Sequence, residues 1–272
     1  MSADVLVEAR DLTKVFRTDS GPVRAVDGVS FAIGRGETFG LVGESGSGKS
    51  TTAALLLALD RPTSGSVTFE GRDIFRLSAG DLRRQRRQMQ MVFQDPVAAL
   101  NRRKTVGQIV GLPLEIHEGA SGAEKRARVA ELLDLVGLPE SFAGRYPHEL
   151  SGGQCQRVGI ARAIALNPSF VILDEAVSAI DVAIQAQILN LFRSLQKRLG
   201  LTYLFVSHDL AVVRYMAPTV AVMHQGKIVE QGSREQIFSD PRHEYTRSLI
   251  AAVPQPDPAD QRWRKAQKEA VA

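Results

Sequence analysis

The sequence predicts an α/β fold built around a parallel sheet, and three observations support this class. Compact apolar runs at residues 89–93, 170–173 and 202–206 are typical of central strands that are covered on both faces. A glycine-rich segment at 43–50 lies between a short apolar run and a helical pattern. Between residues 94 and 159 the residue pattern is typical of helices, which predicts an α-helical segment between the strands.

The first part of the chain predicts a second, antiparallel sheet. Residues 5–12, 23–33 and 66–69 are short strand-like runs separated by glycine and proline. Residues 37–42 are short and largely apolar, which suits a buried strand, and residues 50–59 predict a helix directly after the glycine-rich segment.

The later part of the chain continues these patterns. Residues 124–136 carry apolar side chains near the 3.6-residue spacing of a helix. Residues 226–229 predict a turn into a late strand. From Pro254 the chain becomes proline-rich and then charged, and we expect this tail to be loosely packed.

The segment 43–50 fits the phosphate-loop pattern G-x-x-x-x-G-K-[ST]. Its glycines allow N–H groups to approach phosphate oxygens, and the helix that follows aims its positive end at the same anion. Lys49 adds a point charge for the β- and γ-phosphates, and the Ser50 hydroxyl can complete a Mg²⁺ shell. A chance match is the alternative, and the flanking strand and helix weigh against it. The predicted nucleotide-binding residues here are Gly43, Glu44, Ser45, Gly46, Ser47, Gly48, Lys49, Ser50 and Thr51.

Polar side chains follow three of the predicted strands. Asp174 and Glu175 end the run 170–173, where an open α/β sheet places its ligands. Asp174 can hold Mg²⁺, directly or through water, and Glu175 can orient and polarise water in line with the γ-phosphate. Gln94 can reach Mg²⁺ or water, and His208 can donate to the γ-phosphate. From the residues alone, strand ends that simply meet solvent remain the alternative.

Composition sets modest bounds. The 272 residues are 44% hydrophobic, which suits one large domain or a domain with a subdomain. A net charge of +4 and a pI near 9.4 are compatible with nucleic acid or an anionic membrane as partner. The densest basic run, 83–87, has no interleaved aromatic residues, so we favour a solvated face near bound nucleotide and expect no nucleic-acid partner.

Cysteine usage and hydropathy bear on the compartment. The single cysteine, Cys155, permits no internal disulfide, which fits a reducing compartment. Residues 1–5 lack the basic and apolar regions of a secretion signal. The clearest unbroken apolar run, 53–59, is far short of a membrane span, so we expect any membrane part to be another chain.

Residues 150–154 read LSGGQ and form a second, independent motif. Their hydroxyl and two glycines predict a helix that opens at about Gly153, with exposed N–H donors suited to a γ-phosphate. Together with the phosphate loop, this motif resembles the ATPase subunit of ABC transporters over nearly the whole chain. The resemblance implies a P-loop NTPase (RecA-like) parallel-sheet core, with an N-terminal antiparallel β subdomain and an inserted α-helical subdomain.

The resemblance also implies a role for each motif. The loop 43–50 matches Walker A, Asp174 and Glu175 match Walker B with its catalytic base, Gln94 matches the Q-loop, and His208 matches the switch histidine. ATP and Mg²⁺ are the implied ligands. Within this set, Glu175, His208 and Gln94 are the implied catalytic residues, and Ser50, Gln94 and Asp174 are the implied metal ligands.

Further positions are implied to contact ATP from outside the phosphate loop. Phe16 lies where the family stacks an aromatic ring on adenine, although Phe31 and Phe39 are also near and core positions are the alternative for such rings. In this family the signature faces a neighbour's ATP, which implies a head-to-tail pair of two copies or of this chain with a related subunit. The implied residues at that joint are Ser151, Gly152, Gly153, Gln154 and Asp181.

Two stretches and one single residue depart from the commonest family pattern. Residues 176–181 read AVSAID where Walker B usually continues Pro-Thr-Ser-x-Leu-Asp, and these changes spare the reacting carboxylates. Cys155 replaces a residue that is more often polar, and we expect catalysis to be unaffected. Residues 94–103 resemble a run of peptide-importer ATPases but lack its second proline.

Four stretches, at 94–101, 145–150, 181–187 and 240–249, resemble the ATPases of dipeptide, oligopeptide and nickel import systems. This resemblance implies two transmembrane permease subunits, an extracytoplasmic solute-binding protein and a peripheral position on the cytoplasmic face of the plasma membrane. Peptide is the first expected cargo and nickel the second.

The resemblance divides the chain into four parts. Residues 1–94 form the first part of the nucleotide-binding core with the antiparallel β subdomain, and 95–159 form the α-helical signature subdomain. Residues 160–235 complete the core, and 236–272 form a C-terminal extension of the peptide-importer type. A soluble ABC ATPase of translation or DNA repair usually carries two such domains or a long coiled coil, and a P-loop kinase does not need LSGGQ, so both are less favoured.

Overall fold

The computed structural model describes residues 4–19, 21–178 and 180–252. They form two compact units, one built from residues 4–91, 169–175 and 200–252 and the other from 92–168 and 176–199. None of the helices in these described residues has the length and the apolar character that a membrane span needs.

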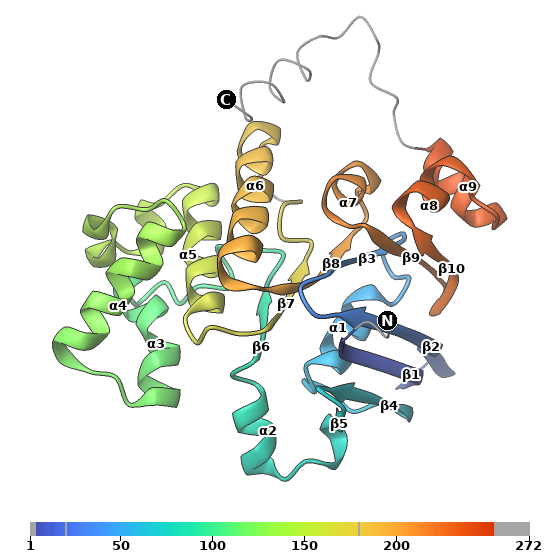
Figure 1. The fold of residues 1–272 in the computed structure, drawn as a ribbon, viewed down its shortest axis with the longest axis horizontal. Helices are drawn as coiled ribbons and strands as arrows, with labels where there is room; N and C mark the ends of the chain where they lie inside the picture. The colour runs from blue at the N-terminus through green and yellow to red at the C-terminus, as the bar shows by residue number, and fades with distance from the viewer. Residues whose placement is uncertain (1–3, 20, 179, 253–272) are drawn as a thin grey trace, which may run out of the picture. The chain divides into compact units, whose positions relative to one another are not determined.

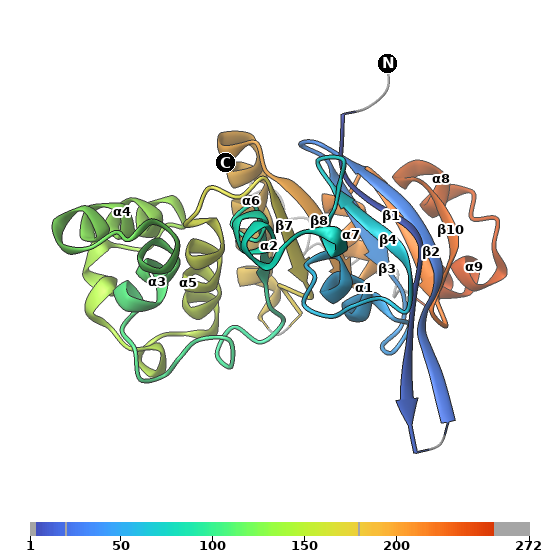
Figure 2. The same ribbon diagram turned by 90° about the horizontal axis from the view of Figure 1, so that it is seen from below.

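The first unit contains the predicted antiparallel sheet. Its strands are β1 (Val5–Thr18), β2 (Gly21–Gly34), β4 (Ser64–Phe69) and β5 (Arg72–Asp73), in the order β2-β1-β4-β5. The first two strands are longer than predicted because they pair as far as Thr18 and Gly21, which makes the long hairpin of Figure 2. The prediction of an antiparallel sheet is confirmed.

The second sheet has the order β10-β9-β3-β8-β7-β6 and is labelled in Figure 1. Strand β3 pairs in parallel with β8 and β9, β8 pairs in parallel with β7, and β10 pairs antiparallel with β9. Every residue of β3, β7 and β8 is buried, as a sheet covered on both faces requires. The strands are β3 (Thr38–Val42), β6 (Met89–Val92), β7 (Phe170–Asp174), β8 (Thr202–Ser207), β9 (Thr219–His224) and β10 (Lys227–Ser233).

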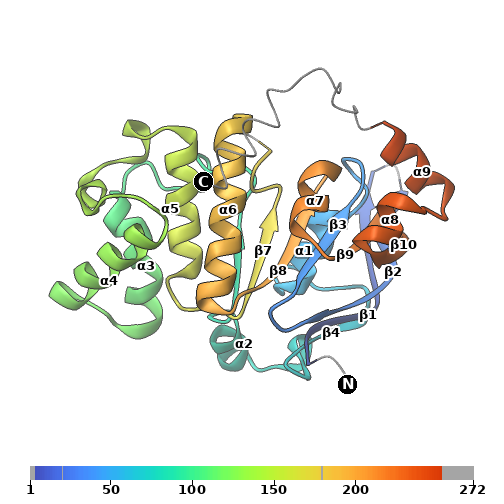
Figure 3. The same ribbon diagram turned by 45° about the horizontal axis from the view of Figure 1, so that its top comes forward.

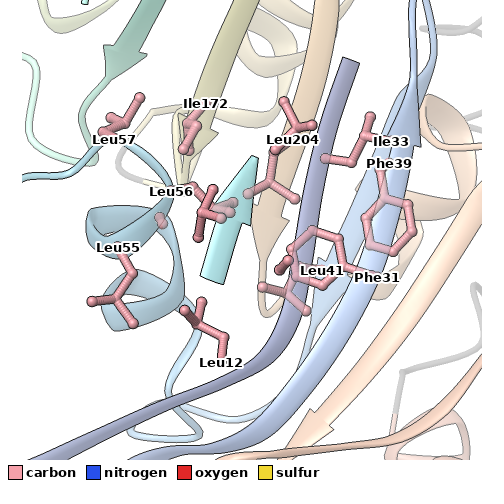
Figure 4. Close-up of a cluster of buried hydrophobic side chains, with 14 of the residues drawn as sticks. Leu12, Phe31, Ile33, Phe39, Leu41, Leu55, Leu56, Leu57, Ile172 and Leu204 are labelled. Atoms are coloured by element: carbon pink, nitrogen blue, oxygen red, sulfur yellow. The ribbon is translucent and has the colours of Figure 1, made fainter. Parts of the chain in front are cut away.

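Helix α1 (Lys49–Leu56) follows β3 and packs into the main core. It is shorter than the predicted helix because Ala58 takes a left-handed φ of 51°, which ends the helical path. Figure 4 shows that Leu56 of α1 lies with apolar side chains from both sheets, among them Phe31, Phe39 and Ile172. Burial of each such side chain stabilises the fold by about 1.5–3 kcal/mol, so this core holds α1 in place in the first unit.

The second unit is helical. Its helices are α3 (Val106–Glu118), α4 (Gly122–Leu135), α5 (Gly152–Ile164) and α6 (Val182–Leu199), with short 3₁₀ turns η2 (Glu140–Gly144) and η3 (Pro147–Glu149). Helices α3, α4 and α5 pack on one another, as Figure 3 shows. The helix predicted over 124–136 is confirmed as α4.

The remaining elements belong to the first unit. They are η1 (Ile74–Arg76), α2 (Ala79–Gln85), α7 (Leu210–Met216), α8 (Arg234–Ser239) and α9 (Glu244–Ala251). The predicted turn at Gly226 is confirmed, since it joins β9 to β10. The tail from Pro254, which we expect to be loosely packed, lies outside the described residues.

Candidate active site

The phosphate loop connects β3 to α1 and is closed in by backbone from other segments. Gly43 has φ 154° and Gly48 has φ 106°, both in the region that favours glycine. A Cβ on Gly43 would collide with the carbonyl oxygen of Met223, and one on Gly48 with that of Ala25. Glycine is therefore required at both positions for steric reasons as well as conformational ones.

Lys49 is buried beneath this loop. Its Nζ donates to the carbonyl oxygens of Gly43 at 2.8 Å and Glu44 at 2.7 Å. Burial lowers the pKa of Lys49, and the negative charges of Glu175, Asp174 and Glu44 partly oppose this effect. The ammonium thus lies under the phosphate loop with acids around it, where it can balance the charge of a polyphosphate.

Asp174 and Ser50 bring two oxygen ligands together at the carboxyl end of β7. The Ser50 hydroxyl donates to Asp174 Oδ1 at 3.3 Å. Burial raises the pKa of Asp174, and the Ser50 hydrogen bond opposes the rise. The described residues contain no group of three or more His, Cys, Asp or Glu side chains that could hold a metal alone. A hydroxyl with one carboxylate fits Mg²⁺, which keeps waters and uses substrate phosphates as ligands.

Glu175 follows Asp174 and pairs with His208 across the sheet edge. His208 Nδ1 lies 3.1 Å from Glu175 Oε1, and the Glu175 main-chain N–H donates to the Val206 carbonyl at 2.9 Å. Glu175 has a left-handed φ of 47°, an uncommon conformation that turns its side chain out of the strand path. The Glu175 side chain is 13% exposed and that of His208 54%, so the histidine is the more accessible member of the pair.

The three candidate aromatic rings have different environments. Phe31 and Phe39 are buried and stack on each other with ring centroids 5.1 Å apart. Phe16 is 38% exposed on the β1–β2 hairpin, and Lys14 Nζ lies 5.0 Å from its ring centroid. Phe16 is thus the ring of the three with a face open to a planar base.

The LSGGQ segment opens α5 one residue earlier than predicted, at Gly152, with Ser151 as its N-cap. The Ser151 hydroxyl accepts from the Gln154 N–H, and Gln154 Oε1 accepts from the Ser151 N–H at 2.9 Å. This reciprocal capping box gives Gln154 a structural role that the sequence interpretation missed. A Cβ on Gly152 would meet open space, whereas one on Gly153 would lie 2.6 Å from Ile184 Cγ2.

Comparison with known proteins identifies the family. Residues 26–178, more than half of the chain, match the family described as ABC transporter. The chain belongs to the ABC transporter family. Residues 229–272 of this ABC chain match a second family, the C-terminal region of oligopeptide/dipeptide transporters. The resemblance inferred from the motifs is confirmed.

Two relatives indicate the subfamily. The chain is 53% identical over 265 residues to the oligopeptide transport ATP-binding protein OppD of Mycobacterium tuberculosis, covering 94% of this chain and 43% of that protein. It is 50% identical over 265 residues to the oligopeptide transport ATP-binding protein OppF of Bacillus subtilis, covering 97% of this chain and 87% of that one. The chain therefore spans less than half of the first relative and most of the second.

Solved ABC cassettes share the fold. A dimeric post-hydrolysis state of the cassette MJ0796, bound to ADP and Pi, has a TM-score of 0.77 and 34% identity, covering 84% of this chain and 99% of that one. The cbiO1 subunit from Clostridium perfringens, part of the ABC transporter complex cbiONQ, has a TM-score of 0.77 and 28% identity, covering 98% and 99%. The predicted P-loop NTPase fold class is confirmed.

The ABC motifs are divided between the two units. The phosphate loop, Asp174, Glu175 and His208 lie in the first unit, where the contacts above bring them together. Gln94, the signature and Asp181 lie in the second unit. Gln94 and Asp181 are both exposed.

The departures from the ABC pattern are accommodated inside the second unit. Cys155 is fully buried, and its Sγ lies 3.5 Å from the Pro147 carbonyl oxygen, with a pKa raised by burial. Ala176 and Val177 are buried, and the Ala176 carbonyl accepts from Gln156 Nε2 at 2.7 Å. An apolar run is therefore tolerated here because these side chains pack in a core.

One contact to the phosphate loop was missed from the sequence. The Glu44 N–H donates to the hydroxyl of Tyr245 on α9, at 3.2 Å. Tyr245 lies in the stretch 240–249 that indicated the subfamily, but no spacing rule connects it to a loop 201 residues away.

Proposed function

We propose that this chain is the ATP-hydrolysing subunit of an ABC importer. The observation that carries the proposal is the contact of Glu175 with His208 in the unit that also holds Lys49, Ser50 and Asp174. A buried cation, a pair of oxygen ligands and a carboxylate with a histidine partner are the groups that phosphoryl transfer to water needs.

Each residue has a separate task in this proposal. The loop N–H groups, the start of α1 and Lys49 bind the phosphates, and Phe16 stacks on adenine. Glu175 accepts a hydrogen bond from water and orients it in line with the γ-phosphate. The oxygen of that water bonds to the γ-phosphorus as the bond from the γ-phosphorus to the bridging β-phosphate oxygen breaks and Glu175 takes up the proton of the water, giving ADP and phosphate. His208, the more exposed partner of Glu175, contacts the γ-phosphate.

Mg²⁺ accompanies ATP in this proposal. Ser50 and Asp174 would hold the ion, and Gln94 stays a predicted ligand on the strength of the family resemblance. When bound, the ion offsets the negative charge of the β- and γ-phosphates. The Ser50–Asp174 contact of 3.3 Å supports this assignment.

The active unit is a head-to-tail pair in which the signature of one subunit faces the ATP of the other. The second subunit is another copy or a related chain, and the dimeric cassette with ADP and Pi supports such a pair. Two transmembrane permeases and an extracytoplasmic solute-binding protein complete the importer. The ATPase then lies on the cytoplasmic face of the plasma membrane.

Di- and oligopeptides are the proposed cargo. The C-terminal match and the names of the OppD and OppF relatives support peptides over nickel. The test is ATP hydrolysis by the assembled importer in vesicles, with the binding protein loaded with peptide or with nickel. Stimulation by peptide is expected. Stimulation by nickel alone would reassign the cargo, and an absence of ATP binding by the purified chain would overturn the function.

A further inference from the structure

The first peptide of the phosphate loop is hydrogen-bonded on both of its sides. Its carbonyl, from Gly43, accepts from Lys49 Nζ at 2.8 Å. Its N–H, from Glu44, donates to the Tyr245 hydroxyl at 3.2 Å. Lys49 is part of the loop motif itself, whereas Tyr245 belongs to helix α9 near the end of the described chain. The C-terminal segment therefore contributes one of the two bonds that orient this peptide.

The ring of Tyr245 is held separately from its hydroxyl. It stacks on His224, with ring centroids 3.8 Å apart and planes inclined by 13°. The turn that follows His224 also reaches the loop, since the Gly226 N–H donates to the Ser47 carbonyl at 2.9 Å. The β9–β10 turn is thus hydrogen-bonded to the second half of the phosphate loop, and Tyr245 is hydrogen-bonded to its first half.

A carboxylate on β10 fixes the approach of α9. Glu230 accepts from Gln236 Nε2 at 2.8 Å, from the Arg242 N–H at 2.8 Å and from the His243 N–H at 3.0 Å. His243 Nδ1 then caps α9 by accepting from the Tyr245 N–H at 3.1 Å. Figure 3 shows α8 and α9 next to β10. Tyr245 is therefore placed by a connected set of bonds that begins in the sheet.

We propose that Tyr245 is a positioning residue of the ATP site, and that its hydroxyl holds the Gly43–Glu44 peptide in the orientation that receives the phosphates. The inference rests on the proposed ATPase function and adds the C-terminal segment to the ATP site. A purely structural role is the alternative, in which the ring packs α9 on the sheet and the hydroxyl has no effect on the loop.

The two roles predict different losses. A loop without the Tyr245 bond must be ordered when ATP binds, which weakens affinity. Loss of one hydrogen bond of ordinary net strength corresponds to an ATP dissociation constant about threefold to tenfold higher. Tyr245 acts through the loop and not on the reacting water, so maximal turnover should change by less than about twofold. Tyr245→Phe keeps the ring and removes the hydroxyl alone.

The experiment compares Tyr245→Phe, Tyr245→Ala and the matched hydroxyl deletion Tyr215→Phe on α7 with the wild-type full chain. Three quantities are measured: the dissociation constant of a fluorescent ATP analogue, hydrogen exchange of loop peptides without nucleotide, and melting temperature. Steady-state phosphate release by the importer supplies KM and kcat. Lys49→Ala is measured in parallel as the test of the ATP site itself.

Tyr245→Phe is expected to raise the dissociation constant and KM about threefold to tenfold and to speed exchange over residues 43–50, with kcat close to wild type and a melting temperature lower by roughly 1–6 °C. Tyr215→Phe, a hydroxyl deletion on α7, is expected to keep wild-type ATP affinity and wild-type exchange over residues 43–50. Wild-type ATP affinity and wild-type hydrogen exchange in Tyr245→Phe, with a lower melting temperature in Tyr245→Ala alone, would show that Tyr245 only packs α9 on the sheet. Wild-type ATP binding by Lys49→Ala would instead overturn the ATP site, and this inference with it.

Discussion

The phosphate loop and the LSGGQ segment both use glycines at the start of a helix, but they are built differently. In the phosphate loop, Gly43 and Gly48 take conformations that favour glycine, and Lys49 and Asp174 supply charges next to it. In the LSGGQ segment, the N-cap Ser151 and Gln154 form hydrogen bonds with each other, and a Cβ on Gly152 would meet open space. The first motif carries its own charged partners, and the second presents a capped helix end.

This difference is consistent with our proposal that the phosphate loop binds ATP within one chain and that the LSGGQ segment acts on the ATP of a partner. A helix N-terminus attracts an anion, but the effect is worth only about 0.3–1 kcal/mol at an exposed position. The phosphate loop adds a buried ammonium, acids and tight backbone. The described LSGGQ segment offers a capped helix N-terminus, and in our proposal it completes a nucleotide site that another subunit already holds.

The largest expected effect concerns the charged groups next to the phosphate loop. Glu175→Gln should keep ATP binding and slow hydrolysis roughly 100-fold or more, because an amide is a far poorer water-orienting group. Lys49→Ala should weaken ATP binding about tenfold or more, as expected for loss of a charged hydrogen-bonding group. Nucleotide titration and phosphate release separate the two effects. Normal turnover in Glu175→Gln would remove Glu175 from its proposed role.

The next effect distinguishes the two signature glycines. Gly153→Ala should cost about 1–2 kcal/mol because its Cβ would press on the stiff, β-branched Ile184. That corresponds to a melting temperature lower by roughly 3–6 °C for a chain of this size. Gly152→Ala, the matched control, meets open space and should not be destabilised.

The double variant Gly153→Ala with Ile184→Ala checks the cause of this loss. Relief of the contact should make the combined loss smaller than the sum of the two single losses. Equal melting temperatures for Gly152→Ala and Gly153→Ala would show that Gly153 is not selected by packing.

A smaller effect is expected at Phe16, the residue proposed to stack on the adenine of ATP. Phe16→Ala should raise the apparent ATP constant about fivefold, equivalent to ~1 kcal/mol of aromatic stacking, and leave maximal turnover similar. Phe31→Ala is the contrast, since loss of a buried ring costs about 3–5 kcal/mol of stability. Unchanged ATP affinity in Phe16→Ala, together with a clear loss of stability, would show that Phe16 is a core residue and does not stack on adenine.

The smallest expected effect depends on pH and concerns Glu230, in the unit that contains the phosphate loop. Burial would raise the pKa of Glu230, but the N–H groups of Arg242 and His243 hold it below its ordinary value of 4.5. A lowered folded-state pKa contributes stability that is complete above pH 4.5 and is lost as pH falls through the folded pKa.

The melting-temperature gap between wild type and Glu230→Gln should therefore be largest near neutral pH and narrow below pH 4.5. Glu131→Gln, an exposed carboxylate on α4, is the control in the other unit. A gap that stays constant between pH 7 and pH 4 would show that the Glu230 charge does not stabilise this segment.

The sequence predicted the central strands and the candidate catalytic side chains at their ends, whose roles stay predictions. Local patterns sufficed for this, since residues 170–175 contain both an apolar strand and its terminal acids. The helix end at Leu56 was misplaced because Ala58 adopts a left-handed φ that no glycine signals. The Glu44–Tyr245 bond and the Gly153–Ile184 contact depend on tertiary packing, so spacing alone could not predict them.

In our proposal the LSGGQ segment of one chain completes the ATP site of another, and sedimentation can detect this pairing. The Glu175→Gln protein is examined with and without MgATP, alone and with Ser151→Arg added. ATP should drive dimer formation of the Glu175→Gln protein but not of the protein that also carries Ser151→Arg, because the arginine places a large cation in the joint. Both proteins should bind ATP with similar affinity. Equal ATP-driven dimerisation in both would contradict the account.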